Sequence, residues 1–257
     1  MILELKDFQA GYASFMTEKT DLLLESGQVI CLVGENGSGK STLMKGIMGL
    51  VKTKGGLYVD EEDYSRTSTR RRTSLMSYLP QTFEMTYSVT VMDLVLMGFN
   101  PDMDVLSGYT RQMKERVRER LASLGMEDLL DKDFLTLSEG QKQKVRLARS
   151  LVRDTRVLLL DEPESTLDFM VRHEMMDLVR RLTKEGNLMT LLVLHDPNLA
   201  LRYGDQVILF KKGRVLDRIS VQEDSDEAIG EKMRRLYEDT LLIRTDSGRL
   251  IIEYDRP

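Results

Sequence analysis

The sequence has no long hydrophobic run and no pair of cysteines, and both absences limit where the protein works. Its single cysteine, Cys31, cannot form an internal disulfide, so we expect a reducing compartment and a packing role within the apolar run 29–33. The longest apolar runs, at 157–160 and 191–194, fall far short of the roughly 20 residues that span a bilayer. Residues 1–7 carry charges where a secretory signal needs a continuous apolar stretch. We therefore expect a cytoplasmic protein that reaches a membrane only peripherally.

An excess of positive charge is also missing. The chain has 37 basic and 42 acidic residues and a net charge of -5, which is unlike the basic surface of a nucleic-acid binder. No nucleic-acid partner is expected. Its 257 residues, 41% of them hydrophobic, are enough to bury a sizeable core, so a folded domain rather than a disordered chain is predicted.

The hydrophobic pattern predicts an α/β fold. Short β-forming runs alternate with longer helical stretches, which is typical of a mainly parallel sheet covered by helices. We expect a buried strand at 28–33, a helix at 41–50 and an amphipathic surface helix at 111–121. Two β-hairpins are expected to turn at 211–214 and 246–249.

A glycine-rich loop between the expected first buried strand and its helix is the strongest motif. It reads Gly34, Glu35, Asn36, Gly37, Ser38, Gly39, Lys40 and Ser41, with Thr42 next. Its glycines let successive backbone N–H groups face phosphate oxygens, and the helix N-terminus adds its positive dipole end. Lys40 would neutralise the β- and γ-phosphates, and the Ser41 hydroxyl would bind Mg²⁺. This spacing in this context predicts a nucleoside triphosphate site rather than an ordinary glycine-rich turn.

Two carboxylates, Asp161 and Glu162, end the apolar run 157–160. Asp161 would hold Mg²⁺ through water, and Glu162 would act as the general base or orient the water that attacks the γ-phosphate. Alone, such a pair would as often cap a helix. Together with the phosphate loop, it predicts ATP hydrolysis.

The segment Leu137 to Gln141 distinguishes the chain from kinases and GTPases. Ser138 and Gln141 have the spacing of a capping box that opens a helix at 141–152. The same segment matches the signature L-S-G-G-Q at four of its five positions. With its phosphate loop and acidic pair, the chain resembles the nucleotide-binding subunit of an ATP-binding cassette (ABC) transporter over nearly its whole length.

This resemblance implies a P-loop NTPase fold of the ABC type, with a mainly parallel core sheet, an N-terminal antiparallel β subdomain and a helical subdomain. It further implies one domain over 1–257, with the helical subdomain at roughly 82–152 and a C-terminal β-hairpin extension at roughly 220–257.

The resemblance also implies roles for single residues near the nucleotide. Gln81 would sense Mg²⁺ and the attacking water, and His195 would donate a hydrogen bond to the γ-phosphate. Tyr12 would stack on adenine, although a core or rim position remains open for this tyrosine. His173 has no counterpart role and is expected to be a surface residue.

A second copy of the chain completes the site in the family that it resembles. Ser138, Gly140 and Gln141 would meet the γ-phosphate held by the other copy, and Asp168 would contact that copy, so two ATP molecules join a homodimer. Glu139 stands where the family has glycine, and we expect its carboxylate to point outward. Glu164 replaces the usual threonine and either raises the pKa of a neighbouring carboxylate or faces solvent.

Two stretches, 88–101 and 194–201, are similar to those of importer subunits for iron chelates, haem and cobalamin. This implies transmembrane permease partners and, indirectly, an extracytoplasmic substrate-binding protein. Phe83, Met85 and Tyr87 either form the groove for a permease coupling helix or belong to the helical core. Zinc or manganese import, and a soluble ATPase that assembles iron–sulfur scaffolds, remain alternatives. A DNA-repair cassette would need a long coiled coil before Ser138, and no heptads are present.

Overall fold

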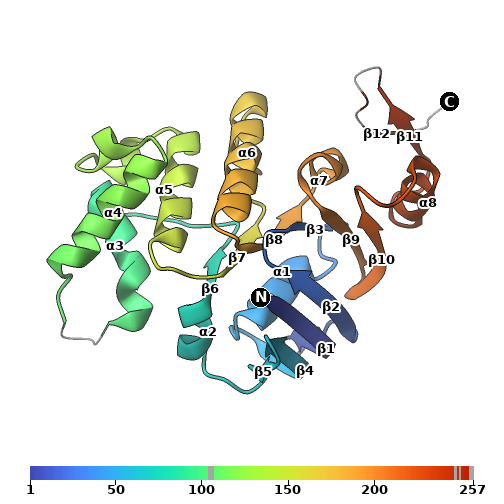
Figure 1. The fold of residues 1–257 in the computed structure, drawn as a ribbon, viewed down its shortest axis with the longest axis horizontal. Helices are drawn as coiled ribbons and strands as arrows, with labels where there is room; N and C mark the ends of the chain where they lie inside the picture. The colour runs from blue at the N-terminus through green and yellow to red at the C-terminus, as the bar shows by residue number, and fades with distance from the viewer. Residues whose placement is uncertain (104–106, 246–247, 249, 255–257) are drawn as a thin grey trace.

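The computed structural model describes residues 1–103, 107–245, 248 and 250–254. A six-stranded sheet forms its centre, in the order β10-β9-β3-β8-β7-β6 (Figure 1). Neighbouring strands run parallel except β9 and β10, which form an antiparallel pair. The strands are β3 (Val29–Val33), β6 (Met76–Leu79), β7 (Val157–Asp161), β8 (Met189–Leu194), β9 (Gln206–Lys211) and β10 (Arg214–Ser220). The predicted α/β class with a mainly parallel sheet is confirmed.

The central strands are apolar runs because both faces of the sheet are covered. Every residue of β3, β7 and β8 is buried. Alternate residues of β3 enter two different cores: Ile30 and Leu32 pack on the side of the first helix, and Cys31 and Val33 pack on the opposite side. The carboxyl ends of β3, β6, β7 and β8 meet at one edge, where ligands bind in open α/β sheets.

A second, antiparallel sheet has the order β2-β1-β4-β5. Its strands are β1 (Ile2–Gly11), β2 (Thr20–Glu25), β4 (Lys52–Val59) and β5 (Glu62–Asp63). Helix α1 (Lys40–Ile47) packs between the two sheets, in the cluster that also contains Phe8 and Leu57. The approach to β1 is close, because a Cβ atom at Gly46 would lie only 2.3 Å from the Cβ of Ala10. The antiparallel sheet matches the one implied by the family resemblance.

Arg72, on α2 (Thr69–Leu75), holds the end of α1 in place. This side chain is 2% exposed, and its Nη1 donates to the carbonyl oxygens of Gly46 and Ile47 at 2.8 and 3.0 Å. Its Nη2 donates to the carbonyls of Tyr64 and Ser65. A cation at the carboxyl end of a helix is favoured by the helix dipole. Arg72 therefore ties the helix that follows the phosphate loop to the antiparallel sheet.

The elements between residues 82 and 152 are helical and lie to one side of the sheet (Figure 1). They are α3 (Val91–Leu96), η1 (Met97–Asp102), α4 (Arg111–Ser123), η2 (Glu127–Leu129), η3 (Phe134–Thr136) and α5 (Glu139–Leu151). Helix α4 is the predicted surface helix, and it buries Val117 and Leu121. Ser138 and Gln141 form the predicted capping box at the start of α5. The boundary of a helical subdomain at 82–152 stays a prediction.

The last elements along the chain are α6 (Phe169–Glu185), α7 (Pro197–Tyr203), α8 (Asp226–Leu236), β11 (Thr240–Arg244) and β12 (Leu250–Tyr254). Both predicted hairpins are present, as β9–β10 and β11–β12, although residues 246, 247 and 249 of the second turn lie outside the described residues. Sequence patterns did not predict α8, whose buried face includes Ile229, Met233 and Leu236. None of the helices within the described ranges is long and apolar enough to cross a membrane.

Candidate active site

The phosphate loop connects β3 to α1, as its sequence context predicts. Its curled backbone depends on glycine: Gly37 and Gly39 have φ values of 74° and 101°, in the left-handed region that side chains disfavour. Gly34 is needed for a different reason, because a Cβ atom there would lie 1.9 Å from the carbonyl oxygen of Phe210 on β9. The loop is thus shaped both by its own turns and by a neighbouring strand.

Polar groups of the loop have the chemistry of an anion site. Lys40 is 4% exposed, and its Nζ donates to the carbonyls of Gly34 and Glu35 at 2.7 and 2.9 Å. Burial lowers the pKa of Lys40, while the carboxylates of Glu162, Asp161 and Glu35 oppose this. The buried Oγ of Ser38 has no hydrogen-bond partner among the described residues. A buried hydroxyl without a partner is costly unless a ligand binds it, so the loop suits a phosphate.

Asp161 lies at the carboxyl end of β7, beside the start of α1. The Oγ of Ser41 donates to its Oδ1 at 3.0 Å, and the hydroxyl of Tyr78 on β6 donates to its Oδ2 at 3.0 Å. Burial, followed by the charge of Asp161, raises the pKa of Tyr78, which therefore stays a donor. The structure brings Ser41 and Asp161 together although 120 positions separate them.

Two side chains that follow other strands of the sheet contact the carboxylate of Glu162. The Nε2 of His195, which follows β8, lies 2.6 Å from its Oε1. The Nε2 of Gln81, which follows β6, donates to its Oε2. Glu162 is 6% exposed and has a φ of 52°, a strained value for a residue with a side chain. Its carboxylate is thus held by two neighbours at the turn that follows β7.

These groups face a common cavity of about 340 Å³. It is lined by Phe15, Asn36, Gly37, Ser38, Gly39, Lys40, Ser41, Thr42, Gln81, Glu162 and His195. The predicted loop residues from Asn36 to Thr42 therefore meet Gln81, Glu162 and His195 in one place, whereas Gly34, Glu35 and Asp161 are not part of the lining. A triphosphate could lie along the loop with its terminal phosphate toward Glu162.

The model of the family described as "ABC transporter" matches residues 17–165, which is more than half of the chain. The chain belongs to the ABC transporter family. ABC ATP-binding subunits hydrolyse ATP, so the cassette described here is an ATPase, and the predicted family membership is confirmed.

Curated relatives extend this similarity over most of the cassette. The achromobactin transport ATP-binding protein of Dickeya dadantii is 35% identical over 226 residues, covering 87% of this chain and 84% of that protein. A petrobactin import ATP-binding protein of Bacillus anthracis is 32% identical, with 91% and 85% covered. The hemin import ATP-binding protein of Hydrogenovibrio crunogenus is 34% identical, with 84% of each chain covered.

Solved structures share the fold. An inward-facing putative metal-chelate type ABC transporter has a chain that superposes with a TM-score of 0.80 at 21% identity, covering 98% of this cassette and 97% of that chain. A dimeric bacterial ABC transporter cassette superposes with a TM-score of 0.73 at 25% identity, covering 86% and 100%. The implied ABC-type fold is therefore confirmed.

Tyr12 does not line the cavity, but Phe15 does. Tyr12 is 50% exposed, and its backbone N–H donates to the carbonyl of Phe15 at 2.8 Å in a tight turn. The ring of Phe15 covers Gly39, where an added Cβ would lie 2.9 Å from its Cζ. Sequence reasoning missed Phe15; its place three residues after Tyr12 was the available signal. The stacking role of Tyr12 stays a prediction.

The signature residues lie away from this chain's own cavity, at the start of α5. Ser138 Oγ accepts from the backbone N–H of Gln141 at 3.3 Å, and Gln141 Oε1 accepts from that of Ser138 at 3.1 Å. A Cβ atom at Gly140 would lie 2.7 Å from Cγ1 of Val171, so the first turns of α5 and α6 pack together. Asp168 caps α6 by accepting from Val171 N at 3.0 Å.

Both departures from the family pattern can be placed. The side chain of Glu139 is 51% exposed and pairs with Lys142 at 2.8 Å, so it points outward as expected. Glu164 is 3% exposed, and its Oε2 has no hydrogen-bond partner within the described part of the chain. Burial and the charge of Glu162 raise the pKa of Glu164 to about 7, against backbone hydrogen bonds that lower it. The alternative that Glu164 faces solvent is therefore wrong.

Glu164→Gln is expected to stabilise the fold above neutral pH. The folded state binds the Glu164 proton more tightly than the unfolded state, since its pKa rises from 4.5 to about 7. The contribution of Glu164 to the free energy of unfolding is therefore complete below pH 4.5 and is lost as the pH rises through 7. The free energy of unfolding falls by up to roughly 3 kcal/mol over this range. Urea unfolding at pH 5 and 8 measures this, with exposed Glu185→Gln as the control. An equal pH dependence in wild type and Glu164→Gln would contradict it.

His173 is half-buried rather than a free surface residue. Its Nδ1 lies 2.9 Å from the hydroxyl of Tyr203, and its ring meets Phe169 edge to face at 4.8 Å. Burial, followed by the charge of Arg202, lowers the pKa of His173. His173 does not line the cavity beside the phosphate loop.

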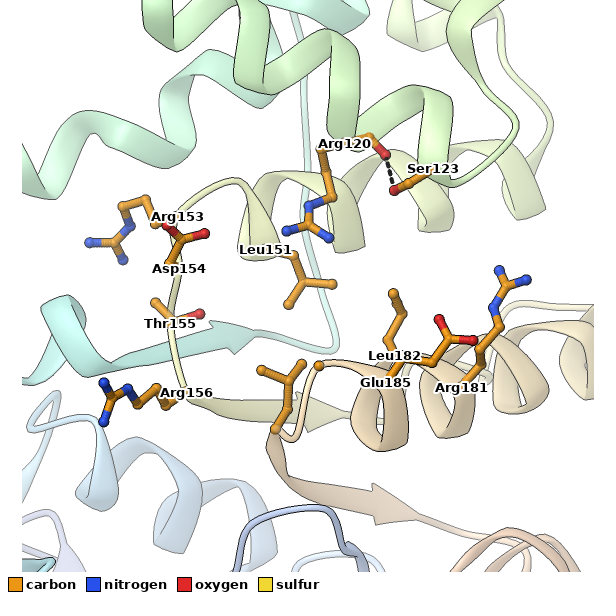
Figure 2. Close-up of a pocket in the computed structure, with 12 residues that line it drawn as sticks. Arg120, Ser123, Leu151, Arg153, Asp154, Thr155, Arg156, Arg181, Leu182 and Glu185 are labelled. Atoms are coloured by element: carbon orange, nitrogen blue, oxygen red, sulfur yellow. Dashed lines mark hydrogen bonds between the residues drawn. The ribbon is translucent and has the colours of Figure 1, made fainter. Parts of the chain in front are cut away.

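A separate hollow of about 550 Å³ borders the chain just before β7 (Figure 2). Four arginines line it: Arg120, Arg153, Arg156 and Arg181. Their guanidinium groups point in different directions rather than toward one centre (Figure 2). The carboxyl ends of α5 and α6 border the same hollow, and cations are favoured there. Asp154 and Glu185 line the same hollow and offset part of this charge, so we assign the arginines no ligand.

Proposed function

We propose that the cassette powers the import of an iron chelate, such as a siderophore or haem, from the inner face of the cell membrane. The observation that carries the proposal is the meeting of Gln81, Glu162 and His195 at the phosphate loop, in a chain whose signature residues face elsewhere. Its relatives include ATP-binding proteins named for achromobactin transport, petrobactin import and hemin import. These names support an iron-chelate cargo. Cobalamin, zinc and manganese are the alternative cargoes.

In the proposed hydrolysis, each residue acts on charge or on a proton. Lys40 turns from its backbone carbonyls to the β- and γ-phosphates. Glu162 accepts the proton of the attacking water, and Gln81 and His195 keep its carboxylate oriented. His195 then also donates toward the γ-phosphate, where negative charge increases.

Ser41 and Asp161 fit Mg²⁺, because they place two oxygen ligands 3.0 Å apart beside the phosphate loop. Within the described residues, no group of three or more His, Cys, Asp or Glu side chains could hold a metal alone. A cation that keeps several waters and shares phosphate oxygens suits such a sparse set. When bound, Mg²⁺ would neutralise phosphate charge.

The second half of the site would come from another copy of the chain. Ser138 and Gly140 open α5, a helix N-terminus that can bind the γ-phosphate of a facing copy. Asp168, at the neighbouring start of α6, would lie in the same interface. The dimeric cassette among the similar structures supports an ATP-joined homodimer. Closing and reopening of this dimer would move the attached permease subunits.

A groove of about 380 Å³ beside Gln81 is the proposed seat of the permease coupling helix. Its apolar lining includes Met48, Leu50, Pro80, Phe83, Met97 and Pro101. Phe83 lines this groove and also packs edge to face on Phe134 at 6.2 Å, so its position is compatible with both of the roles left open by the sequence. Met85 packs on the helical core, and Tyr87 is 59% exposed.

Leu50→Glu is expected to release the cassette from its permease. Leu50 is 51% exposed in the groove, so a charge there would oppose an apolar helix without disturbing the fold. The test is co-purification of the tagged chain from solubilised membranes of its own host, with hydrophobic permease chains identified by mass spectrometry. Leu23→Glu, at a strand position of similar exposure (44%), is the matched control.

The same experiment separates transport from the assembly alternative. The importer is supported if wild type and Leu23→Glu are recovered with permease chains and Leu50→Glu is recovered without them. Recovery only in soluble complexes would overturn it in favour of an iron–sulfur assembly ATPase. An extracytoplasmic substrate-binding protein would join through the permease and not through this chain.

A further inference from the structure

A cavity of about 570 Å³, separate from the catalytic one, lies between α6, α7 and the C-terminal hairpin. Its apolar walls come from Phe169, Leu199, Leu201, Val221, Leu250 and Ile251. This volume is within the range of small-molecule sites, which are mainly apolar with a few placed polar groups. None of the motifs that bind or hydrolyse ATP uses these side chains.

The hairpin that forms one wall of the cavity is anchored to α7 by one side chain. Asn198 accepts from the backbone N–H of Ile252 through Oδ1 at 2.7 Å and donates to its carbonyl through Nδ2 at 3.2 Å. This pairing imitates the hydrogen bonds of a neighbouring strand. Arg244, on the other strand of the hairpin, pairs with Asp226 at the start of α8. The wall formed by Leu250 and Ile251 is therefore fixed over the cavity.

Two arginines that line this cavity have guanidinium N–H groups that make few hydrogen bonds within the described residues. The buried Nε of Arg172 has no partner among the described residues, and its Nη2 makes only a long contact of 3.5 Å with the carbonyl of Leu167. Over the same described ranges, the guanidinium of Arg202 makes no hydrogen bond or ion pair and lies 5.4 Å from the ring centre of Tyr203. Asp196 is the one carboxylate in the lining, and Arg244 is already paired.

We propose that this cavity binds a small organic anion with an apolar body, whose acidic group pairs with Arg172 and Arg202 and whose body lies against the leucine, valine and isoleucine walls. A neutral apolar ligand would cover the guanidinium groups of Arg172 and Arg202 without pairing their charge, which is unfavourable. A cation would meet two guanidinium groups. The charge and shape of the cavity together select the anion.

The position of the cavity gives such a ligand access to the ATPase machinery. Helix α6 begins directly after Asp168, and α7 begins two residues after His195. An anion that bridges Arg172 on α6 and Arg202 on α7 would restrict the movement of these two helices relative to each other. We expect bound ligand to lower the ATPase rate; this part of the inference depends on the proposed function, and the binding does not.

Decanoate is the probe, with decyltrimethylammonium as the cation of matched length. Isothermal titration calorimetry without nucleotide should show one decanoate per chain and no binding of the cation. Arg172→Gln/Arg202→Gln should weaken decanoate at least about tenfold, the value of one charged hydrogen bond. Val221→Phe, which fills the cavity without changing charge, should abolish binding. Arg156→Gln/Arg181→Gln, in the hollow of Figure 2, removes the same number of charges and is the control.

Absence of decanoate binding, equal binding of the cation, or wild-type affinity in both cavity variants would overturn the site. If decanoate binds as expected but leaves the ATPase rate unchanged in an active enzyme, the site stands and its regulatory effect is wrong. If the protein shows no ATPase activity at all, the proposed function fails while the calorimetric result still decides the site.

Discussion

Glu162→Gln is expected to lower the ATPase rate by at least about 100-fold while leaving ATP binding intact, because the amide cannot accept a proton from water. Glutamine has nearly the same shape, so Gln81 and His195 keep a neighbour at hydrogen-bond distance. Hydrolysis and not assembly is then blocked. With ATP present, Glu162→Gln should accumulate as the closed dimer. This dimer elutes earlier than the monomer on size-exclusion chromatography.

The matched control is Glu119→Gln on the exposed surface of α4, which should behave as wild type. Phosphate release measures the rate, and chromatography with and without ATP measures the dimer. Normal turnover by Glu162→Gln would remove Glu162 from its role as the base. If Glu162→Gln loses ATPase activity but forms no dimer with ATP, the role of Glu162 as the base stands and the site completed by a second copy is contradicted.

Lys40→Ala is expected to weaken ATP binding by about 100-fold, through the loss of a cation that meets two phosphates. The same change leaves the carbonyls of Gly34 and Glu35 without their donor, so the free energy of unfolding should fall by about 1–3 kcal/mol. Both effects come from one side chain that alternates between backbone and phosphate.

Lys45→Ala, in the last turn of the same helix, is the control for charge and helix propensity. Isothermal titration calorimetry with a non-hydrolysable ATP analogue gives the affinity, and urea unfolding gives the stability. Wild-type affinity in Lys40→Ala would mean that the phosphate loop does not hold the triphosphate through this lysine.

Local patterns predicted much of this fold because the elements around the site are locally encoded. The phosphate loop, the strand before Asp161 and the capping box of Ser138 each depend on residues within a few positions of one another, and all are present where expected. Helix α8 is absent from the predicted elements, although its buried residues Ile229, Met233 and Leu236 recur at helical spacing after the capping residue Ser225.

Long-range relations were beyond these patterns. Phe15 and Tyr12 are three residues apart and equally aromatic, and only the fold decides that Phe15 covers Gly39. Glu164 could have faced water or a neighbouring carboxylate until packing placed it 3% exposed. Neither outcome follows from spacing, because each depends on which distant segment covers the side chain.

The sequence by itself determined that this chain holds a triphosphate and belongs with the ABC cassettes, since a phosphate loop, an acidic pair and a signature are read within short segments. Only the tertiary structure decided which side chains meet: Gln81, Glu162 and His195 converge because parallel strands bring their carboxyl ends to one edge. It also decided that the signature turn lies outside the cavity beside the phosphate loop of its own chain. The physical reason is that motifs encode local backbone shape, whereas the partner of a side chain is chosen by the packing of the whole fold.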